Sequence, residues 1–454
     1  MKVVSKKSVL AGHIVVPGSK SHTIRSLILA GLADGSSRIL NPLQSNDCLS
    51  TAKALKQIGA DISFDEKVWT VKGAGKNLHL PENEINVDNS GSLMYFLAPV
   101  LSTLEGECTF TGDESICNRP VAHLLDAFSQ LGVSAKSING DNKPPFSFTG
   151  PIDINKKLVT DGALSQYISG FMMAATCCNG TLKIELKNPK ETPYLTMTKL
   201  WLEEVGAKPT ISHDFKKISV GGPVELHSFE KAIPSDWEGV AFPLIAALIA
   251  GSGSNITIDN VDCTGSQGDA KIVEILQSVG ANIVLDKKNN SLHVRGNRRL
   301  TTKGLPRKTL RINISDFPDA ICALAVIACF IEGKTIINDV DICRKKETDR
   351  VKAMTMILSD LGADIKDDGD CLIINGHWPY NENGTLNTDC KLHGGVVNPL
   401  KDHRIAMAMA CFGLGLGNNQ AVEIEDGECC SVSFPDFYNL MNKIGAGFAI
   451  SEGK

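Results

Sequence analysis

The stretch LKQIGADISF (residues 55–64) contains the unit from which this chain is built. It indicates the end of an amphipathic helix followed by a strand, because Gly59 stands where a helix C-terminus needs the left-handed conformation. The same pattern recurs, with an apolar residue before the glycine and alanine or valine after it, at Gly132, Gly206, Gly280, Gly362 and Gly445. Successive glycines of this set lie 73 to 83 residues apart. The chain is therefore a sixfold repeat.

A second recurring feature is a glycine that opens a predicted strand. It occurs once in each unit, at residues 35–40, 106–110, 180–184, 253–258, 333–337 and 417–424. Units of about 75 residues, alternating strands with two helices, are too small to bury a core alone and must pack together. Single cores rarely grow past ~250–300 residues, so a chain of 454 residues with 43% apolar composition predicts two groups of three units.

Composition excludes several classes of protein. The net charge is −5 with acidic and basic residues well mixed, so there is no basic face for nucleic acid, and any anionic ligand needs local cationic clusters. The fourteen cysteines include no C-x-x-C pair, which indicates reduced thiols and neither a disulfide framework nor a zinc site. No signal peptide and no apolar stretch of membrane-spanning length is present. We expect a soluble, cytoplasmic protein with no membrane partner.

Polar clusters open several of the apolar helices. They are PGSKSHTIR (17–25), DNSGS (88–92), SDFPDA (315–320), RKKETDR (344–350) and KDHRIAMAMA (401–410). Taken singly, PGSKSHTIR is more often a solvated turn and RKKETDR a charged surface, and DNSGS and SDFPDA are explained as well by a helix cap as by a site. On a helix, Lys346 and Arg350 would share a face, because they are four residues apart. Arg404 at the start of a buried helix opposes the helix dipole, which an anionic ligand would relieve.

Several cationic clusters on separate repeats, in a chain of net negative charge, favour a ligand with several anionic groups. Free N–H groups at helix starts are suited to such a ligand, which we expect to lodge between the two halves. The sequence has neither the His/Cys spacing of a metal site nor a G-x-G-x-x-G after a strand. We therefore expect no metal and no organic cofactor.

Motifs along nearly the whole chain resemble the EPSP synthase (3-phosphoshikimate 1-carboxyvinyltransferase) family of enolpyruvyl transferases. They are PGSKSHTIR, NSGS, NRPVAHLLDAF, LSQY, TPYL, FPDA, KKETDR, KDHRIAMAMA and SFPDF, in the family's order and spacing. The resemblance implies a two-domain inside-out α/β barrel of six βαβαββ-like repeats, three in each domain. It implies one domain over residues 20–235, a second over 1–19 plus 236–454, and a hinge near 19–20 and 235–236. We expect a monomer.

The reaction implied by this resemblance belongs to the shikimate pathway. It moves the enolpyruvyl group of phosphoenolpyruvate to the 5-hydroxyl of shikimate 3-phosphate and releases phosphate. At matching positions, the resemblance implies phosphoenolpyruvate contacts at Lys20, Gly91, Arg119, Gln166, Arg350 and Arg404, the two last forming a carboxylate clamp. It implies acceptor contacts at Lys20, Ser21, Arg25, Ser165, Gln166, Tyr194, Asp319 and Lys346. It implies Asp319 as the base, Glu347 as the acid, Lys346 beside the reacting hydroxyl, His403 as an orienting group and Lys20 as a further catalytic residue.

Four positions depart from the family pattern. Tyr95 and Val432 replace an arginine and a lysine near the phosphoenolpyruvate pocket, and Leu164 and Glu191 replace two serines that hold the acceptor phosphate. A carboxylate near a phosphate is worse than a deletion, because like charges repel strongly when partly desolvated. The sequence therefore leaves open a diverged transferase whose acceptor lacks that phosphate.

Two further alternatives remain at this stage. A non-catalytic binding protein would explain the losses but leaves Asp319 and Glu347 without a reason. The related transferase that acts on UDP-N-acetylglucosamine is expected to carry a Lys-Asn pair in place of Lys20 and Ser21. It is also expected to carry a reactive cysteine on a mobile loop, near the place of Cys117.

Overall fold

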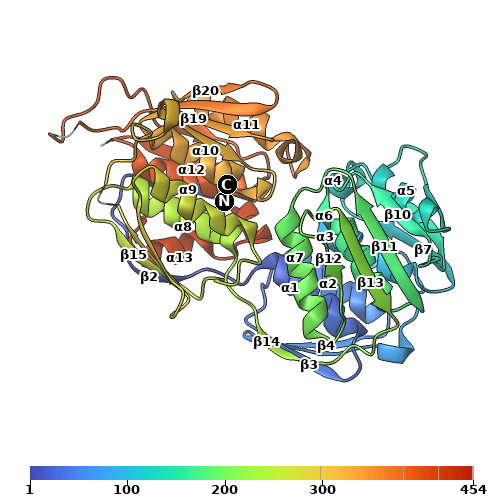
Figure 1. Cartoon of the computed structure of the whole chain (residues 1–454). Helices are drawn as coiled ribbons and strands as arrows, with labels where there is room; N and C mark the ends of the chain where they lie inside the picture. Colours follow the sequence, from blue (N-terminus) through green and yellow to red (C-terminus); the bar gives the residue numbers. More distant parts are fainter. Residues whose placement is uncertain (297, 382, 418, 452–454) are drawn as a thin grey trace. The chain divides into compact units, whose positions relative to one another are not determined.

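The computed structural model describes residues 1–451 apart from 297, 382 and 418. The chain divides into two compact units, which we call unit 1 (Met1–Pro17 with Ser235–Lys454) and unit 2 (Gly18–Pro234). Unit 1 is thus made from both ends of the chain, and unit 2 is one continuous segment (Figure 1). Within the described residues, no helix is long and apolar enough to cross a membrane.

Each unit contains three four-stranded sheets among the described residues. The first sheet of unit 2 contains, in order, β14 (Glu230–Ala232), β3 (Ser36–Leu40), β5 (Val68–Lys72) and β4 (Asp61–Phe64). The second contains β6 (Ile85–Asn86), β7 (Gly106–Thr111), β9 (Phe146–Gly150) and β8 (Ser134–Ser137). The third contains β10 (Lys157–Thr160), β11 (Gly180–Leu186), β13 (Lys217–Gly222) and β12 (Thr210–Ile211). The first sheet of unit 1 contains, in order, β2 (Ala11–Val15), β15 (Asn255–Asp259), β17 (Ser291–Arg295) and β16 (Asn282–Asp286). The second contains β18 (Thr309–Asn313), β19 (Gly333–Asn338), β21 (Cys371–Gly376) and β20 (Asp364–Asp367). The third contains β22 (Gly395–Val397), β23 (Ala421–Ile424), β1 (Lys2–Lys6) and β24 (Ala449–Ser451).

All of these sheets follow one pairing rule. In the order just given, the first strand runs parallel to the second, and the remaining neighbours are antiparallel. The sixfold repeat predicted from the glycine spacing is therefore confirmed at the level of sheet topology. Three sheets are completed by a strand from a distant part of the chain, because β14 pairs with β3, β2 with β15 and β1 with β23.

The helices of each repeat are of two kinds. Six helices of eight residues or more are apolar and buried over most of their length: α1 (Lys20–Leu32), α3 (Gly91–Leu101), α6 (Ser165–Ala175), α8 (Trp237–Ile249), α10 (Ile321–Phe330) and α12 (His403–Gly415). The others present a polar face or are short: α2 (Asn46–Gln57), α4 (Glu114–Cys117), α5 (Ala122–Gln130), α7 (Thr192–Glu204), α9 (Ile272–Ser278), α11 (Arg350–Asp360) and α13 (Phe437–Lys443). A helix that is apolar all round must lie in the interior.

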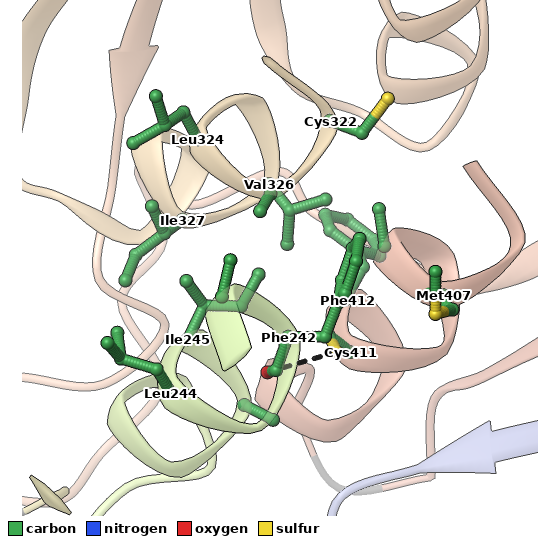
Figure 2. Close-up of a cluster of buried hydrophobic side chains, with 14 of the residues drawn as sticks. Phe242, Leu244, Ile245, Cys322, Leu324, Val326, Ile327, Met407, Cys411 and Phe412 are labelled. Carbon is green, nitrogen blue, oxygen red and sulfur yellow. Dashed lines mark hydrogen bonds between the residues drawn. The ribbon is translucent and has the colours of Figure 1, made fainter. Parts of the chain in front are cut away.

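The core of unit 1 is where α8, α10 and α12 meet. Phe242 and Ile245 of α8, Val326 of α10 and Phe412 of α12 point toward one another (Figure 2), and all are at most 1% exposed. Cys411 donates a weak hydrogen bond to the carbonyl of Phe242 at 3.4 Å. Helices therefore lie inside and sheets lie outside in the unit, which agrees with the inside-out α/β arrangement expected from the sequence.

The glycine stops behave as predicted. Gly59, Gly132, Gly206, Gly280, Gly362 and Gly445 all have positive φ, between 82° and 108°, one or two residues after a helix. At Gly362 there is a second reason for glycine, because a Cβ there would lie 2.1 Å from the carbonyl oxygen of Lys391. These residues end the polar helices and turn the chain into the following strands, such as β4 and β16.

Candidate active site

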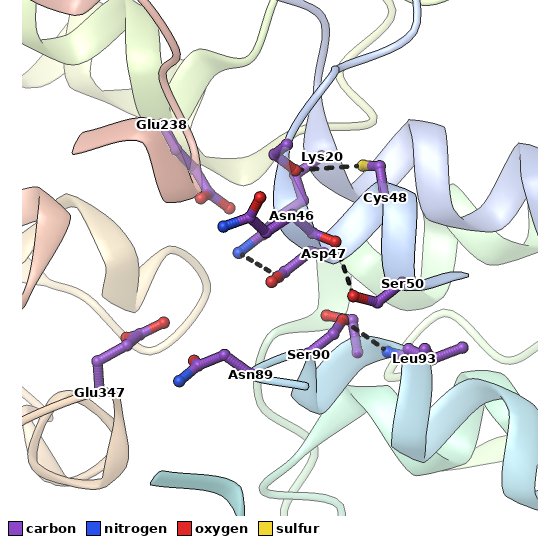
Figure 3. Close-up of polar contacts among 12 residues, drawn as sticks. Lys20, Asn46, Asp47, Cys48, Ser50, Asn89, Ser90, Leu93, Glu238 and Glu347 are labelled. Carbon is purple, nitrogen blue, oxygen red and sulfur yellow. Dashed lines mark hydrogen bonds and ion pairs between the residues drawn. The ribbon is translucent and has the colours of Figure 1, made fainter. Parts of the chain in front are cut away.

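The N-terminus of α1 in unit 2 carries Lys20. Ser19 caps this helix by accepting a hydrogen bond from the His22 N–H at 3.5 Å. The Lys20 ammonium lies 3.3 Å from the carboxylate of Asp47 on α2 (Figure 3), and only 14% of its side chain is exposed. Lys20 is thus held, charged and largely buried, beside the open end of a helix dipole.

The N-terminus of α3 gathers three of the predicted phosphate contacts. Ser90 caps it, accepting from the Leu93 N–H at 3.2 Å (Figure 3). Arg119 approaches so closely that a Cβ on Gly91 would lie 3.0 Å from its Nη1. The amide of Gln166 on α6 donates to the Ser92 hydroxyl at 3.0 Å. Gly91, Arg119 and Gln166 therefore lie together around one helix start, which is suited to an anion.

Two links join this helix start to the rest of unit 2. Ser50, on the same helix as Asp47, donates a hydrogen bond to Asp88 at 2.6 Å. Arg119 donates to Asn89 at 3.4 Å. The loop before α3 is thereby tied both to α2 and to the arginine that stands over it.

The N-terminus of α6 is occupied by a carboxylate of the chain itself. The cap position, Leu164, provides no side-chain acceptor. Instead, one oxygen of Glu191 accepts from the Ser165 N–H at 3.1 Å and from the Ser165 hydroxyl at 3.0 Å. Glu191 is 3% exposed and has a left-handed backbone with φ of 52°. This departure from the family pattern therefore places a buried carboxyl group at the N-terminus of α6.

Arg25 lies in the interior of unit 2, at 1% exposure. Its guanidinium donates to the hydroxyl of Thr198 at 2.8 Å and to the carbonyls of Ser21 and Tyr194 at 3.1 and 3.3 Å. Burial lowers the pKa of Arg25 to about 9, although Tyr194 and Glu191 act in the opposite direction. Ser21, Arg25 and Tyr194, all predicted acceptor contacts, thus belong to one hydrogen-bonded group.

Two other departures from the family pattern, Tyr95 and Val432, are uncharged side chains. Tyr95 is 5% exposed, donates to the Pro120 carbonyl at 3.3 Å and packs beside His123 and Tyr167. Burial raises the pKa of the Tyr95 hydroxyl. Val432 is half-buried at the end of a short 3-10 helix, Gly427–Val432. Tyr95 fills its place in unit 2 as part of an aromatic group.

Arg350 is the centre of the polar cluster in unit 1. Its side chain is 0% exposed and lies 2.6 Å from Asp319, 2.6 Å from Glu347 and 2.8 Å from Asp402. Burial by itself lowers the pKa of Arg350, but the charges of Asp402, Glu347 and Asp319 raise it well above its ordinary value. The predicted base and acid are thereby fixed to the same guanidinium.

Lys346 completes this group from the other side of Asp319. Its ammonium lies 3.1 Å from Asp319 Oδ2, the oxygen that Arg350 does not take. The expectation that Lys346 and Arg350 share one helix is wrong. Asp349 caps α11 by accepting from the Lys352 N–H at 3.0 Å, so the helix begins only at Arg350. The two cations meet through Asp319 instead.

Arg404 and His403 open α12, where the sequence suggested a conflict with the helix dipole. Asp402 caps the helix, accepting from the Arg404 N–H at 2.9 Å. The Arg404 guanidinium forms an ion pair with Glu238 in the first turn of α8, and its Nε lies 3.4 Å from Asp319. Carboxylates of the chain itself therefore relieve the mismatch, where an anionic ligand had been expected. His403 is 1% exposed.

A further buried acid lies next to this group. Asp269 is 1% exposed, in the 3-10 helix Gly268–Lys271. Burial raises the pKa of Asp269 well above its ordinary value, and the charges of Asp319 and Asp236 add to the effect while Lys346 opposes it. Ionisation in this part of unit 1 is therefore coupled through Asp319.

Four acidic residues of the site were missed by reasoning from sequence: Asp47, Glu238, Asp269 and Asp402. Asp402 had a detectable signal, because an aspartate directly before a helix is a common N-cap. Glu238 and Asp47 also fall in first turns of helices, but their partners lie far along the chain. Local pattern cannot indicate such pairing.

Known proteins resemble this chain from end to end. The family model of EPSP synthase (3-phosphoshikimate 1-carboxyvinyltransferase) matches residues 4–441. A 3-phosphoshikimate 1-carboxyvinyltransferase of Acetivibrio thermocellus is 32% identical over 98% of this chain and 99% of its own length. That of Methanocaldococcus jannaschii is 33% identical over 99% of each chain. The structure of EPSP synthase from Acinetobacter baumannii, at 24% identity, has the same fold, with a TM-score of 0.81 over 99% of both chains. The chain belongs to the EPSP synthase family.

Proposed function

We propose that this protein transfers the enolpyruvyl group of phosphoenolpyruvate to the 5-hydroxyl of shikimate 3-phosphate and releases phosphate. The observation that carries this proposal is that Arg350 holds Asp319 and Glu347 while Lys346 contacts the same Asp319. Asp319 comes from the 3-10 helix Pro318–Ala320 and the other three residues from the segment 346–350, yet they form one contiguous group. Proton transfer at two centres needs such a group, in which carboxylates and cations hold one another in place.

In this proposal Asp319 takes the proton of the attacking hydroxyl and Glu347 protonates the vinyl carbon, which gives a tetrahedral intermediate with a methyl group. One methyl proton then returns to Glu347 as the C–O bond to phosphate breaks, and the vinyl group is restored on the acceptor oxygen. Lys346, 3.1 Å from Asp319, stabilises negative charge on the reacting oxygen. His403 orients the group from the start of α12. Arg350 and Arg404 bind the carboxylate of phosphoenolpyruvate, for which the planar fork of arginine is suited.

Unit 2 supplies the remaining contacts in this proposal. Lys20, Gly91, Arg119 and Gln166 bind the phosphate of phosphoenolpyruvate at helix starts, where free N–H groups and a positive dipole end favour an anion. The acceptor contacts are Ser21, Arg25, Ser165 and Tyr194, with Lys20 and Gln166 shared between the two substrates. The hydrogen bonds from Arg25 to Ser21 and Tyr194 support a common acceptor region.

A second candidate function is transfer to an acceptor that lacks the phosphate. The observation that favours it is Glu191, whose carboxylate already takes the N–H and the hydroxyl of Ser165. A phosphate at the same helix end would have to displace this carboxylate or tolerate its repulsion. An acceptor with a hydroxyl there would instead donate a hydrogen bond to Glu191.

Turnover by variants tests the proposed reaction. We expect Asp319→Asn and Glu347→Gln each to reduce phosphate release from phosphoenolpyruvate by about a hundredfold to ten-thousandfold, because each removes a proton-transferring group. The matched control is Asp316→Asn, which changes an aspartate that pairs with Lys271 on the surface and should leave turnover unchanged. Thermal unfolding checks that all three variants are folded. Near-normal rates in the first two would refute the assigned roles.

A calorimetric titration separates the two candidate acceptors. Shikimate 3-phosphate and shikimate are titrated in turn, each with and without phosphoenolpyruvate. Tighter binding of the phosphate ester supports the first candidate. Equal or tighter binding of shikimate supports the second, and Glu191→Ser should then restore preference for the ester.

A further inference from the structure

Arg404 pairs with a carboxylate of the chain itself. Glu238 pairs with its Nη2, and the two side chains are 9% and 3% exposed, so the pair is shielded from water. Glu238 is the second residue of α8, and its N–H donates to the cap residue Asp236 at 3.2 Å. Its carboxylate therefore contacts the guanidinium from the first turn of α8.

The side chains of this cluster include more carboxylates than cations. The cations are Lys346, Arg350 and Arg404, and the carboxylates in contact with them are Glu238, Asp319, Glu347 and Asp402. An additional carboxylate that arrived at Arg404 would meet repulsion from Glu238 in a partly dry environment. Like charges at such range oppose each other strongly.

We propose that Glu238 is a built-in competitor that a substrate carboxylate must displace from Arg404, and that it sets the affinity of the site for carboxylates. This inference rests on the proposed function, in which Arg404 binds the carboxylate of phosphoenolpyruvate. Glu238 contacts no reacting atom and acts only through Arg404, so it is a positioning residue. It keeps the guanidinium oriented when the site is empty, and it weakens binding when substrate arrives.

The decisive variant is Glu238→Gln, which keeps the shape of the side chain and removes its charge. We expect the Kd for phosphoenolpyruvate to fall by about tenfold or more, because the carboxylate of Glu238 no longer competes for Arg404. The Kd for pyruvate, used as a probe without phosphate, should fall by the same factor. The KM for phosphoenolpyruvate should fall with it, and kcat should stay level or decrease. A purely structural role would change thermal stability without this selective effect on KM.

Two controls define the result. Glu274→Gln removes the same charge from the first turn of α9, where the side chain is exposed, and should change neither Kd nor KM. Glu238→Asp keeps the charge with a shorter side chain and should not tighten binding. Tighter binding in Glu238→Asp would mean that loosened packing is the cause, and it would overturn the proposal.

The outcomes separate this inference from the proposed function. Turnover in the unaltered protein with unchanged KM and Kd in Glu238→Gln refutes the role of Glu238 and leaves the reaction in place. If the unaltered protein shows no turnover but Glu238→Gln binds pyruvate at least tenfold more tightly, the proposed reaction is refuted. The role of Glu238 as a competitor for Arg404 is then supported. If neither the unaltered protein nor Glu238→Gln binds phosphoenolpyruvate or pyruvate, the competitor proposal is overturned.

Discussion

Each unit buries an arginine completely, and the two arginines have opposite surroundings. Arg350 in unit 1 contacts three carboxylates, and its pKa is raised well above the ordinary value. Arg25 in unit 2 donates chiefly to hydroxyls and carbonyls, and burial lowers its pKa to about 9. Nearby carboxylates therefore favour the charged form of arginine in unit 1, and burial disfavours it in unit 2.

This difference shows how one repeat supports two kinds of polar site. In unit 1 the positive charges are met by acids of the chain itself. In unit 2 the buried cation is met mainly by neutral dipoles, so an anion placed nearby would be attracted. Sheet topology is common to both units, and the choice of side chains at helix starts separates their chemistry.

The largest expected effect is on the stability of unit 1. Arg350→Met leaves the buried Asp402 and the partly buried Asp319 and Glu347 without their shared cation. Removal of one partner of a buried ion pair costs about 3–5 kcal/mol. Urea denaturation should show this loss. The control is Arg38→Met, because Arg38 pairs with Glu230 at the surface, where both side chains are more than half exposed, and such pairs contribute less than about 1 kcal/mol. Equal effects of the two variants would contradict the central role of Arg350.

A smaller effect is expected from Asp269→Asn, and it depends on pH. The raised pKa of Asp269 means that the folded protein retains a proton that the unfolded chain releases near pH 4. Stability is therefore full below that pH and falls as pH rises through the folded pKa, by up to about 1.4 kcal/mol per pH unit. Asp269→Asn should flatten this fall in denaturation measurements from about pH 4 to about pH 8. An unchanged slope would show that Asp269 ionises normally.

The smallest effect is expected from Arg25→Met. Removing a buried cation that lacks a close carboxylate relieves its desolvation, and the hydroxyls of Thr198 and Ser169 still bond each other at 2.8 Å. The change in unfolding free energy should lie within about 1 kcal/mol of zero, or be stabilising. A loss as large as that of Arg350→Met would remove the contrast between the two units. Binding of shikimate should weaken in the same variant if Arg25 serves the acceptor.

The features that could be predicted from sequence are those fixed by neighbouring residues. Gly59 and its equivalents end helices because the left-handed backbone is a local requirement, and Ser19 and Ser90 cap helices within three residues of themselves. The break between Lys346 and Arg350 was missed, because Asp349 as a cap competes with the helical spacing. Glu238 could not be paired with Arg404 from sequence, since 166 residues separate them and only packing of α8 on α12 joins them.

In unit 1, strands from the N-terminal segment pair with strands from later in the chain, and this pairing affects folding during synthesis. The strands β1 and β2 are synthesised before unit 2, yet their partners β15, β23 and β24 are synthesised after it. Unit 2, as one continuous segment, can finish folding on the ribosome while β1 and β2 still wait with unpaired edges. During synthesis the unpaired edges of β1 and β2 are therefore the part of unit 1 that is open longest to pairing with another chain.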